Sequence, residues 1–171
     1  MRKNNIEVIA HHEAGHIVIG HIVGLGMPDS VSIRPIEGAL GHVAGYRNPC
    51  ASVLLVAAEA EVMMCVAGVI AANAYKPRSH HWLAQGSSDY SRADSLLAMH
   101  YSDDDASQGK ALRRLEREVR ALVKRPEVSS AIEYVADQLM KRETIEGDDF
   151  VDLLNAVGTM VKDSFREYLR K

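Results

Sequence analysis

The sequence predicts a mainly α fold of the α+β class, a helical bundle with a small β element, in one domain over residues 1–171. Apolar residues recur at three- and four-residue spacing along most of the chain, which is typical of amphipathic helices. Two short runs alternate apolar and polar residues, which predicts the β element. The chain is 47% apolar and 25% charged and contains no internal repeat, so one core is expected.

The first half of the chain is expected to form a helix, two strands and a second, long helix. Residues 5–24 fit the first helix, which a turn rich in glycine and proline ends. The strands are expected at residues 31–36 and 40–46. Residues 51–75 are apolar almost all round in their second half, which predicts a largely buried helix.

The second half is expected to be helical after a loop over residues 77–86. Ser88 is a suitable N-cap for a helix that ends near residue 101. The acidic run 103–105 suits the positive end of the next helix dipole, and Pro126 suits the first turn of the helix after it. A last pair of helices is expected after Gly147.

The charge of the chain gives no sign of a nucleic-acid partner. There are 20 basic and 23 acidic residues, for a formal charge of −3. The most apolar stretch, residues 62–72, is about half of the roughly 20 residues that a spanning helix needs, and no export signal is present. Two cysteines are too few for a disulfide framework. We therefore expect a cytoplasmic protein with no membrane span.

One motif in the first helix carries chemistry. Residues 12–16 read His-Glu-Ala-Gly-His and fit HExxH. Residues four apart lie on one face of a helix, so the imidazoles of His12 and His16 can bind one Zn²⁺. Glu13 lies about 100° further round the helix, where its carboxylate can take a proton from a metal-activated water. The motif predicts hydrolysis of a peptide bond with Glu13 as general base.

A plainer interpretation treats His12 and His16 as ordinary helix residues. Two features weigh against it. The helix is expected to be apolar on both sides, so buried polar groups there need a partner. Gly15 costs about 1 kcal/mol relative to Ala in mid-helix, which suggests that something approaches closely. The ligand types favour zinc over other divalent metals.

A zinc site of this type needs a third protein ligand, and the spacing leaves that choice open. The candidates are acids or histidines on later elements: Glu59, Glu61, Asp89, Asp94 and the pair His80–His81. As a plain alternative, Asp89 is a carboxylate favoured by the dipole at a helix start. His11 and His21 are not expected to be ligands, and His42 is expected at the surface.

Further segments follow the HExxH helix in a particular order. They are the strand-forming residues 31–35, the glycine-rich run 38–41, the small-residue run 65–72, Gly86–Asp89 with Ala93 four residues on, and residues 141–150. In this order, over about residues 8–155, the chain resembles the peptidase domain of the FtsH-type ATP-dependent zinc metalloproteases. The resemblance implies that Asp89 is the third zinc ligand beside His12 and His16.

The resemblance also implies a zinc metalloendopeptidase that acts on flexible or unfolded polypeptides. The family's ATPase module and membrane anchor are not expected here, since no GxxxxGK[ST] loop occurs. The domain is then ATP-independent by itself, with a separate ATPase or unfoldase as a candidate partner and a homo-oligomer as a candidate assembly. An extended substrate is expected to pair with the strand at residues 40–46.

Two alternatives come from other classes. One is a catalytically idle peptidase-like module that binds a peptide or a partner ATPase. The other is a metal hydrolase that acts on small substrates, such as an amidase.

Overall fold

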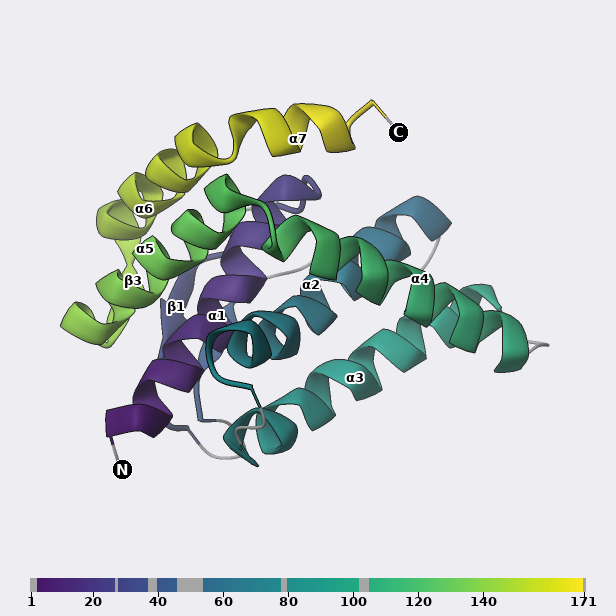
Figure 1. Ribbon diagram of the computed structural model, residues 1–171, viewed down its shortest axis with the longest axis horizontal. Coiled ribbons are helices and arrows are strands. Elements are labelled where there is room, and N and C mark those ends of the chain that lie inside the picture. The colour runs from purple at the N-terminus through teal and green to yellow at the C-terminus, as the bar shows by residue number, and fades with distance from the viewer. Residues whose placement is uncertain are drawn as a thin grey trace.

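The computed structural model describes residues 3–26, 28–36, 40–45, 54–77, 80–101 and 105–170. In chain order their elements are α1 (Lys3–Ile22), β1 (Ser30–Ser32), β2 (His42–Ala44), α2 (Leu55–Tyr75), α3 (His80–His100), α4 (Asp105–Val123), α5 (Pro126–Arg142), β3 (Thr144–Glu146), α6 (Gly147–Met160) and α7 (Lys162–Tyr168) (Figure 1). The fold is mainly helical with a small sheet, so the predicted fold class is confirmed.

Helices α1 and α2 form the centre of the bundle (Figure 1). They approach closely because α1 has no side chain at Gly15, where a Cβ atom would lie 2.7 Å from both the Ala67 carbonyl oxygen and the Ala71 Cβ. Every residue of α2 from Ala60 to Ala72 is buried. By length and composition α2 is apolar enough to cross a membrane, but 78% of its apolar window lies inside the fold, as in a core helix.

The strands form one antiparallel sheet in the order β2-β1-β3. Val31 in β1 pairs with Val43 on one side and with Ile145 on the other, so one face of the sheet carries an apolar row. The first two strands are shorter than the predicted 31–36 and 40–46, and residue 46 lies outside the described residues. Strand β3 was not predicted, because three residues give too short a pattern to recognise.

Helix α3 differs most from its prediction. It begins at His80, whereas a loop was expected over residues 77–86 and a helix start at Ser88. The segment contains good helix formers in Leu83, Ala84 and Gln85, and these outweigh the cost of Gly86. As a consequence, Asp89 lies well inside a helix that packs along α2, and not at a helix start.

The remaining helices follow the predicted pattern. Helix α5 begins at Pro126, as expected from a proline that suits the first helical turn. Helices α6 and α7 form the predicted last pair and pack beside α5 and α1 (Figure 1). The amphipathic stripe of α4, which includes Leu115 and Val119, completes the core against α2. These helices enclose the HExxH helix, so the motif lies in the interior.

Candidate metal centre

Three of the predicted site residues meet at one point. His12 and His16 extend from successive turns of α1, and Asp89 reaches them from α3. The two histidine Nε2 atoms lie 3.0 Å apart. Asp89 Oδ2 lies 3.1 Å from His12 Nε2 and 3.5 Å from His16 Nε2. The fold therefore brings together residues that are more than seventy positions apart in the sequence.

These distances fit a divalent cation. In a tetrahedral zinc site with bonds of about 2.0–2.1 Å, neighbouring ligand atoms lie about 3.3–3.4 Å apart, close to the three distances found here. Asp89 Oδ2 is buried, and within the described part of the chain it makes no hydrogen bond of good geometry. A metal ion bound between this carboxylate oxygen and the two imidazole nitrogens would satisfy all three atoms.

Helix α2 orients one of the imidazoles. His16 Nδ1 donates a hydrogen bond of 2.8 Å to the Met64 carbonyl oxygen, which turns Nε2 toward His12 and Asp89. The His12 ring stands edge-on to the His16 ring, with centroids 4.7 Å apart and planes at 83°. The second nitrogen of His12, Nδ1, is buried without a hydrogen-bond partner among the described residues.

Gly68 of α2 leaves the space that both imidazoles occupy. A Cβ atom at this position would lie 2.5 Å from His16 Nε2 and 2.8 Å from His12 Cε1, far inside van der Waals contact. No other amino acid can stand at residue 68 without displacing the histidines. Helix α2 therefore contributes to the centre in two ways: Gly68 leaves space for the imidazole rings, and the Met64 carbonyl group orients His16.

Glu13 lies beside the three converging residues without being one of them. Its side chain is buried, and Gly41, just before β2, approaches so closely that a Cβ there would lie 2.6 Å from Glu13 Oε1. Burial, together with the nearby charge of Asp89, raises the pKa of Glu13 to about 8. A carboxyl group with such a pKa can both take and release a proton near neutral pH.

The charges of the cluster are strongly coupled. Burial lowers the pKa of His12 below its usual value. Burial acts in the same direction on His16, but the Asp89 carboxylate outweighs it and raises the pKa of His16 to about 9. Burial opposes ionisation of Asp89, yet the two imidazoles hold its pKa well below the usual range. Without a metal, a proton on His16 thus balances the Asp89 carboxylate.

The other candidates for the third ligand are engaged elsewhere or exposed. Glu61 forms an ion pair with Arg92 of α3, and Glu59 forms one with Arg114 of α4. Asp94 is exposed on α3. His80 and His81 open α3, and their side chains lie outside the description. Of the acids considered, Asp89 alone joins the histidines.

His11 and His21 pack against aromatic rings and do not join the centre, in line with the expectation that they are not ligands. His11 stacks on Tyr75 with ring centroids 3.7 Å apart, and its Nδ1 atom donates to the Glu7 carbonyl oxygen. His21 lies against Phe165 of α7. His42 was expected at the surface, but it is partly buried in β2, and its Nδ1 atom has no hydrogen-bond partner within the described residues.

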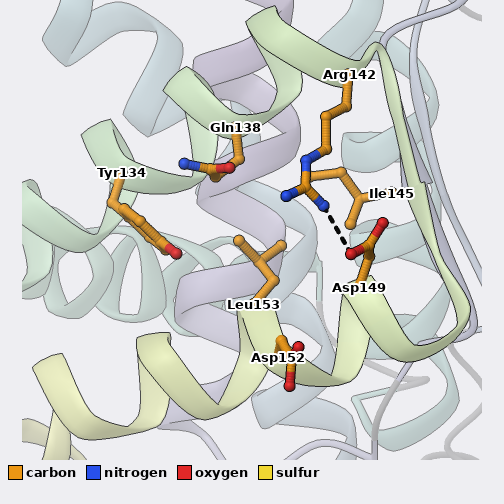
Figure 2. A pocket seen from close by; sticks show the side chains of 7 residues that line it. All are labelled: Tyr134, Gln138, Arg142, Ile145, Asp149, Asp152 and Leu153. Carbon is orange, nitrogen blue, oxygen red and sulfur yellow. Dashed lines mark ion pairs between the residues drawn. The ribbon is translucent and has the colours of Figure 1, made fainter.

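A hollow lies away from the metal centre, beside β3 at the other edge of the sheet, between α5, β3 and α6 (Figure 2). Arg142 and Asp149 on its wall form an ion pair of 3.0 Å and so neutralise each other. Arg142 and Asp149 point toward each other, and the other polar side chains, Tyr134, Gln138 and Asp152, do not join them (Figure 2).

Comparison of the chain with protein-family models and with curated proteins finds no match. The functional argument therefore rests on the geometry of the centre and on the sequence motifs. Three contributors to the site were not predicted: the Met64 carbonyl group, Gly68 and Gly41. Gly68 belongs to a run of small residues, but nothing local to that run indicates that it faces the histidines.

Proposed function

We propose that the protein is a zinc-dependent endopeptidase that cleaves flexible or unfolded polypeptides. The observation that supports it most is the convergence of His12, His16 and Asp89 beside the buried carboxyl group of Glu13. The first three residues would hold Zn²⁺, which supplies Lewis acidity toward a carbonyl group and makes a water molecule more acidic at neutral pH.

Glu13 is the general base in this proposal. Its carboxylate takes the proton of the attacking water and returns it to the leaving amine, a role that requires a pKa near the working pH. In the metal-free site, burial beside Asp89 raises the pKa of Glu13 to about 8, and a nearby cation would lower that pKa toward neutral pH. The close backbone of Gly41 restricts where the Glu13 carboxyl group can lie.

The position of β2 favours an extended polypeptide as substrate. β2 is an edge strand, because within the described residues it pairs with β1 alone. Gly41, which precedes β2, lies against Glu13, so a chain that adds to this edge would pass close to the general base. Pairing through main-chain hydrogen bonds selects for an unfolded segment more than for particular side chains.

Replacement of Glu13 by Gln tests the proposal directly. We expect Glu13→Gln to retain zinc, measured as metal content, and to lose about 10²- to 10⁴-fold in the rate of casein cleavage, because the general base is gone. A His16→Ala variant is the control for metal loss, and a chelator should abolish wild-type cleavage. Casein cleavage by Glu13→Gln at the wild-type rate would contradict the assignment of the base.

The same assay separates the alternatives. A zinc-loaded wild type that binds casein without cleaving it would support a catalytically idle binding module. Cleavage of short peptides or amides but not of casein would support a hydrolase for small substrates.

A further inference from the structure

The three residues of the metal centre come from two helices that are held together mainly by a third. His12 and His16 belong to α1, and Asp89 belongs to α3. Helix α2 packs extensively against both, whereas α1 and α3 contact each other far less. The position of Asp89 relative to the histidines therefore depends on how α3 sits on α2.

An ion pair between a buried glutamate and a half-exposed arginine joins α2 to α3 close to Asp89. Glu61 of α2 has a side chain only 4% exposed, and Arg92 of α3 follows Asp89 by three residues. The Arg92 Nε atom donates a hydrogen bond of 2.8 Å to Glu61 Oε1, and a terminal guanidinium nitrogen donates to the same oxygen. The guanidinium group also interacts with the Cys65 thiol, one turn further along α2.

Stability alone is a weak reason for such a pair. Removing the Glu61 carboxylate from water costs several kcal/mol, and solvent screens its attraction to an arginine whose side chain is 55% exposed. The arginine instead fixes the relative orientation of the two helices, because its planar guanidinium group donates hydrogen bonds in a fixed geometry. Residues three apart are neighbours on a helix, so a contact that fixes Arg92 also fixes Asp89.

We infer that the Glu61–Arg92 ion pair positions the third metal ligand, by setting the rotation of α3 at which Asp89 reaches His12 and His16. This inference rests on the proposed metal centre. A rotation of α3 by about 10° moves a side-chain oxygen by about 1 Å, whereas metal–ligand distances tolerate about 0.2 Å. Arg92 is thus a positioning residue that acts through Asp89.

The chain contains a matched control for this pair. Glu59, also on α2, forms an ion pair with Arg114 and accepts a second hydrogen bond from the Tyr101 hydroxyl. Arg114 belongs to α4, which contributes no ligand to the centre. The Glu59–Arg114 pair therefore has the same chemistry and the same parent helix as the Glu61–Arg92 pair, but its arginine does not lie beside Asp89. Its one link to α3 is through Tyr101, which follows the far end of that helix, 12 residues from Asp89.

The experiment compares Glu61→Gln/Arg92→Gln with Glu59→Gln/Arg114→Gln. Zinc affinity is measured by competition with a chelator, and Tm is measured on the metal-free proteins. We expect Glu61→Gln/Arg92→Gln to weaken zinc binding by about tenfold or more, the range found when groups that orient metal ligands are removed. The Glu59→Gln/Arg114→Gln variant should bind zinc within about twofold of wild type despite a similar loss of Tm.

Cobalt supplies a readout that a loss of stability would not change. The visible absorption of bound Co²⁺ reports coordination geometry, and it should weaken in Glu61→Gln/Arg92→Gln alone. Arg92→Lys keeps the charge but loses the fork, so its zinc affinity should fall between those of wild type and the double variant. If the double variant does not fold, Arg92→Lys carries the same test.

Several results would overturn the inference. Equal zinc affinities for the two double variants, or affinity losses that follow the Tm losses in both, would reduce the pair to a structural contact. Because affinity is read without hydrolysis, a wild type that binds zinc but cleaves nothing would refute only the proposed function. A wild type that binds no zinc would refute both.

Discussion

The two faces of α2 hold their neighbours in different ways. Toward α1 the contact is steric, since Gly15 and Gly68 remove side chains and let the helices and imidazoles approach. Toward α3, near the centre, the contact is ionic and joins Glu61 to Arg92. The spacing of His12 and His16 is set within α1, so the contact between α1 and α2 needs only to provide space for their rings. Asp89 belongs to a different helix, so the contact between α2 and α3 has to set its position relative to the histidines.

The largest expected effect comes from filling the steric contact. Gly68→Ala places a Cβ atom 2.5 Å from where His16 Nε2 now lies, so His16 and its neighbour must move. We expect zinc affinity to fall by about 100-fold or more, at the upper end of the losses seen when ligand orientation is disturbed. Competition with a chelator measures the change.

A glycine outside the contact provides the control. At Gly109 in α4, an added Cβ would meet only the flexible end of Arg113, at 3.3 Å. Gly109→Ala should leave zinc affinity unchanged and should stabilise the helix by up to about 1 kcal/mol. Unchanged zinc affinity in Gly68→Ala would show that the steric face of α2 does not constrain the histidines.

A smaller effect is expected at Gly15, where the same face packs backbone against backbone. The Cβ atom of Gly15→Ala would lie 2.7 Å from the Ala67 carbonyl oxygen, so α1 and α2 must separate. Overpacking of this kind costs about 1–3 kcal/mol, more than the gain of about 1 kcal/mol in helix propensity. Urea unfolding of the metal-free protein measures the loss. Stabilisation by Gly15→Ala would contradict the tight contact.

The smallest effect is expected in the reactivity of Cys65, which lies on α2 next to the Glu61–Arg92 ion pair. Burial raises the pKa of the Cys65 thiol to about 12, which lowers its thiolate fraction at neutral pH by about 1000-fold relative to an exposed thiol. In a Cys50→Ser background, reaction with a thiol reagent should therefore be very slow until the protein unfolds. Adding Glu61→Gln/Arg92→Gln should speed the reaction, because it removes the ion pair that covers Cys65 between α2 and α3. Fast labelling of the folded Cys50→Ser protein would contradict the burial.

Much of the fold could be predicted because its signals are local. The i, i+4 spacing of His12 and His16 places them on one helix face, and the apolar periodicity locates α1, α2 and α5 to within a few residues. The start of α3 and the strand β3 could not be predicted. The glycine and serines at residues 86–88 suggested a helix start, although good helix formers at residues 83–85 precede them. Strand β3 has only three residues and is fixed by its pairing with β1, which no local window of the sequence contains.

The third ligand shows the same limit within the site. From spacing alone, Glu59, Glu61 and Asp89 were equally good candidates for the third ligand, because each lies on a predicted helix. Arginines from α3 and α4 distinguish them in the fold by neutralising the two glutamates and leaving Asp89 to the histidines. Those arginines lie 31 and 55 residues from their partners, so the pairing is a property of the folded chain.

Gly68 has a consequence for protein engineering. To build this centre into another helical bundle, one would first replace the facing residue of the neighbouring helix by glycine, because the two imidazole rings must fit before they can bind a cation. Transfer of the HExxH motif alone would therefore fail wherever the host's neighbouring helix has any side chain, even the methyl group of alanine, at the position that corresponds to Gly68.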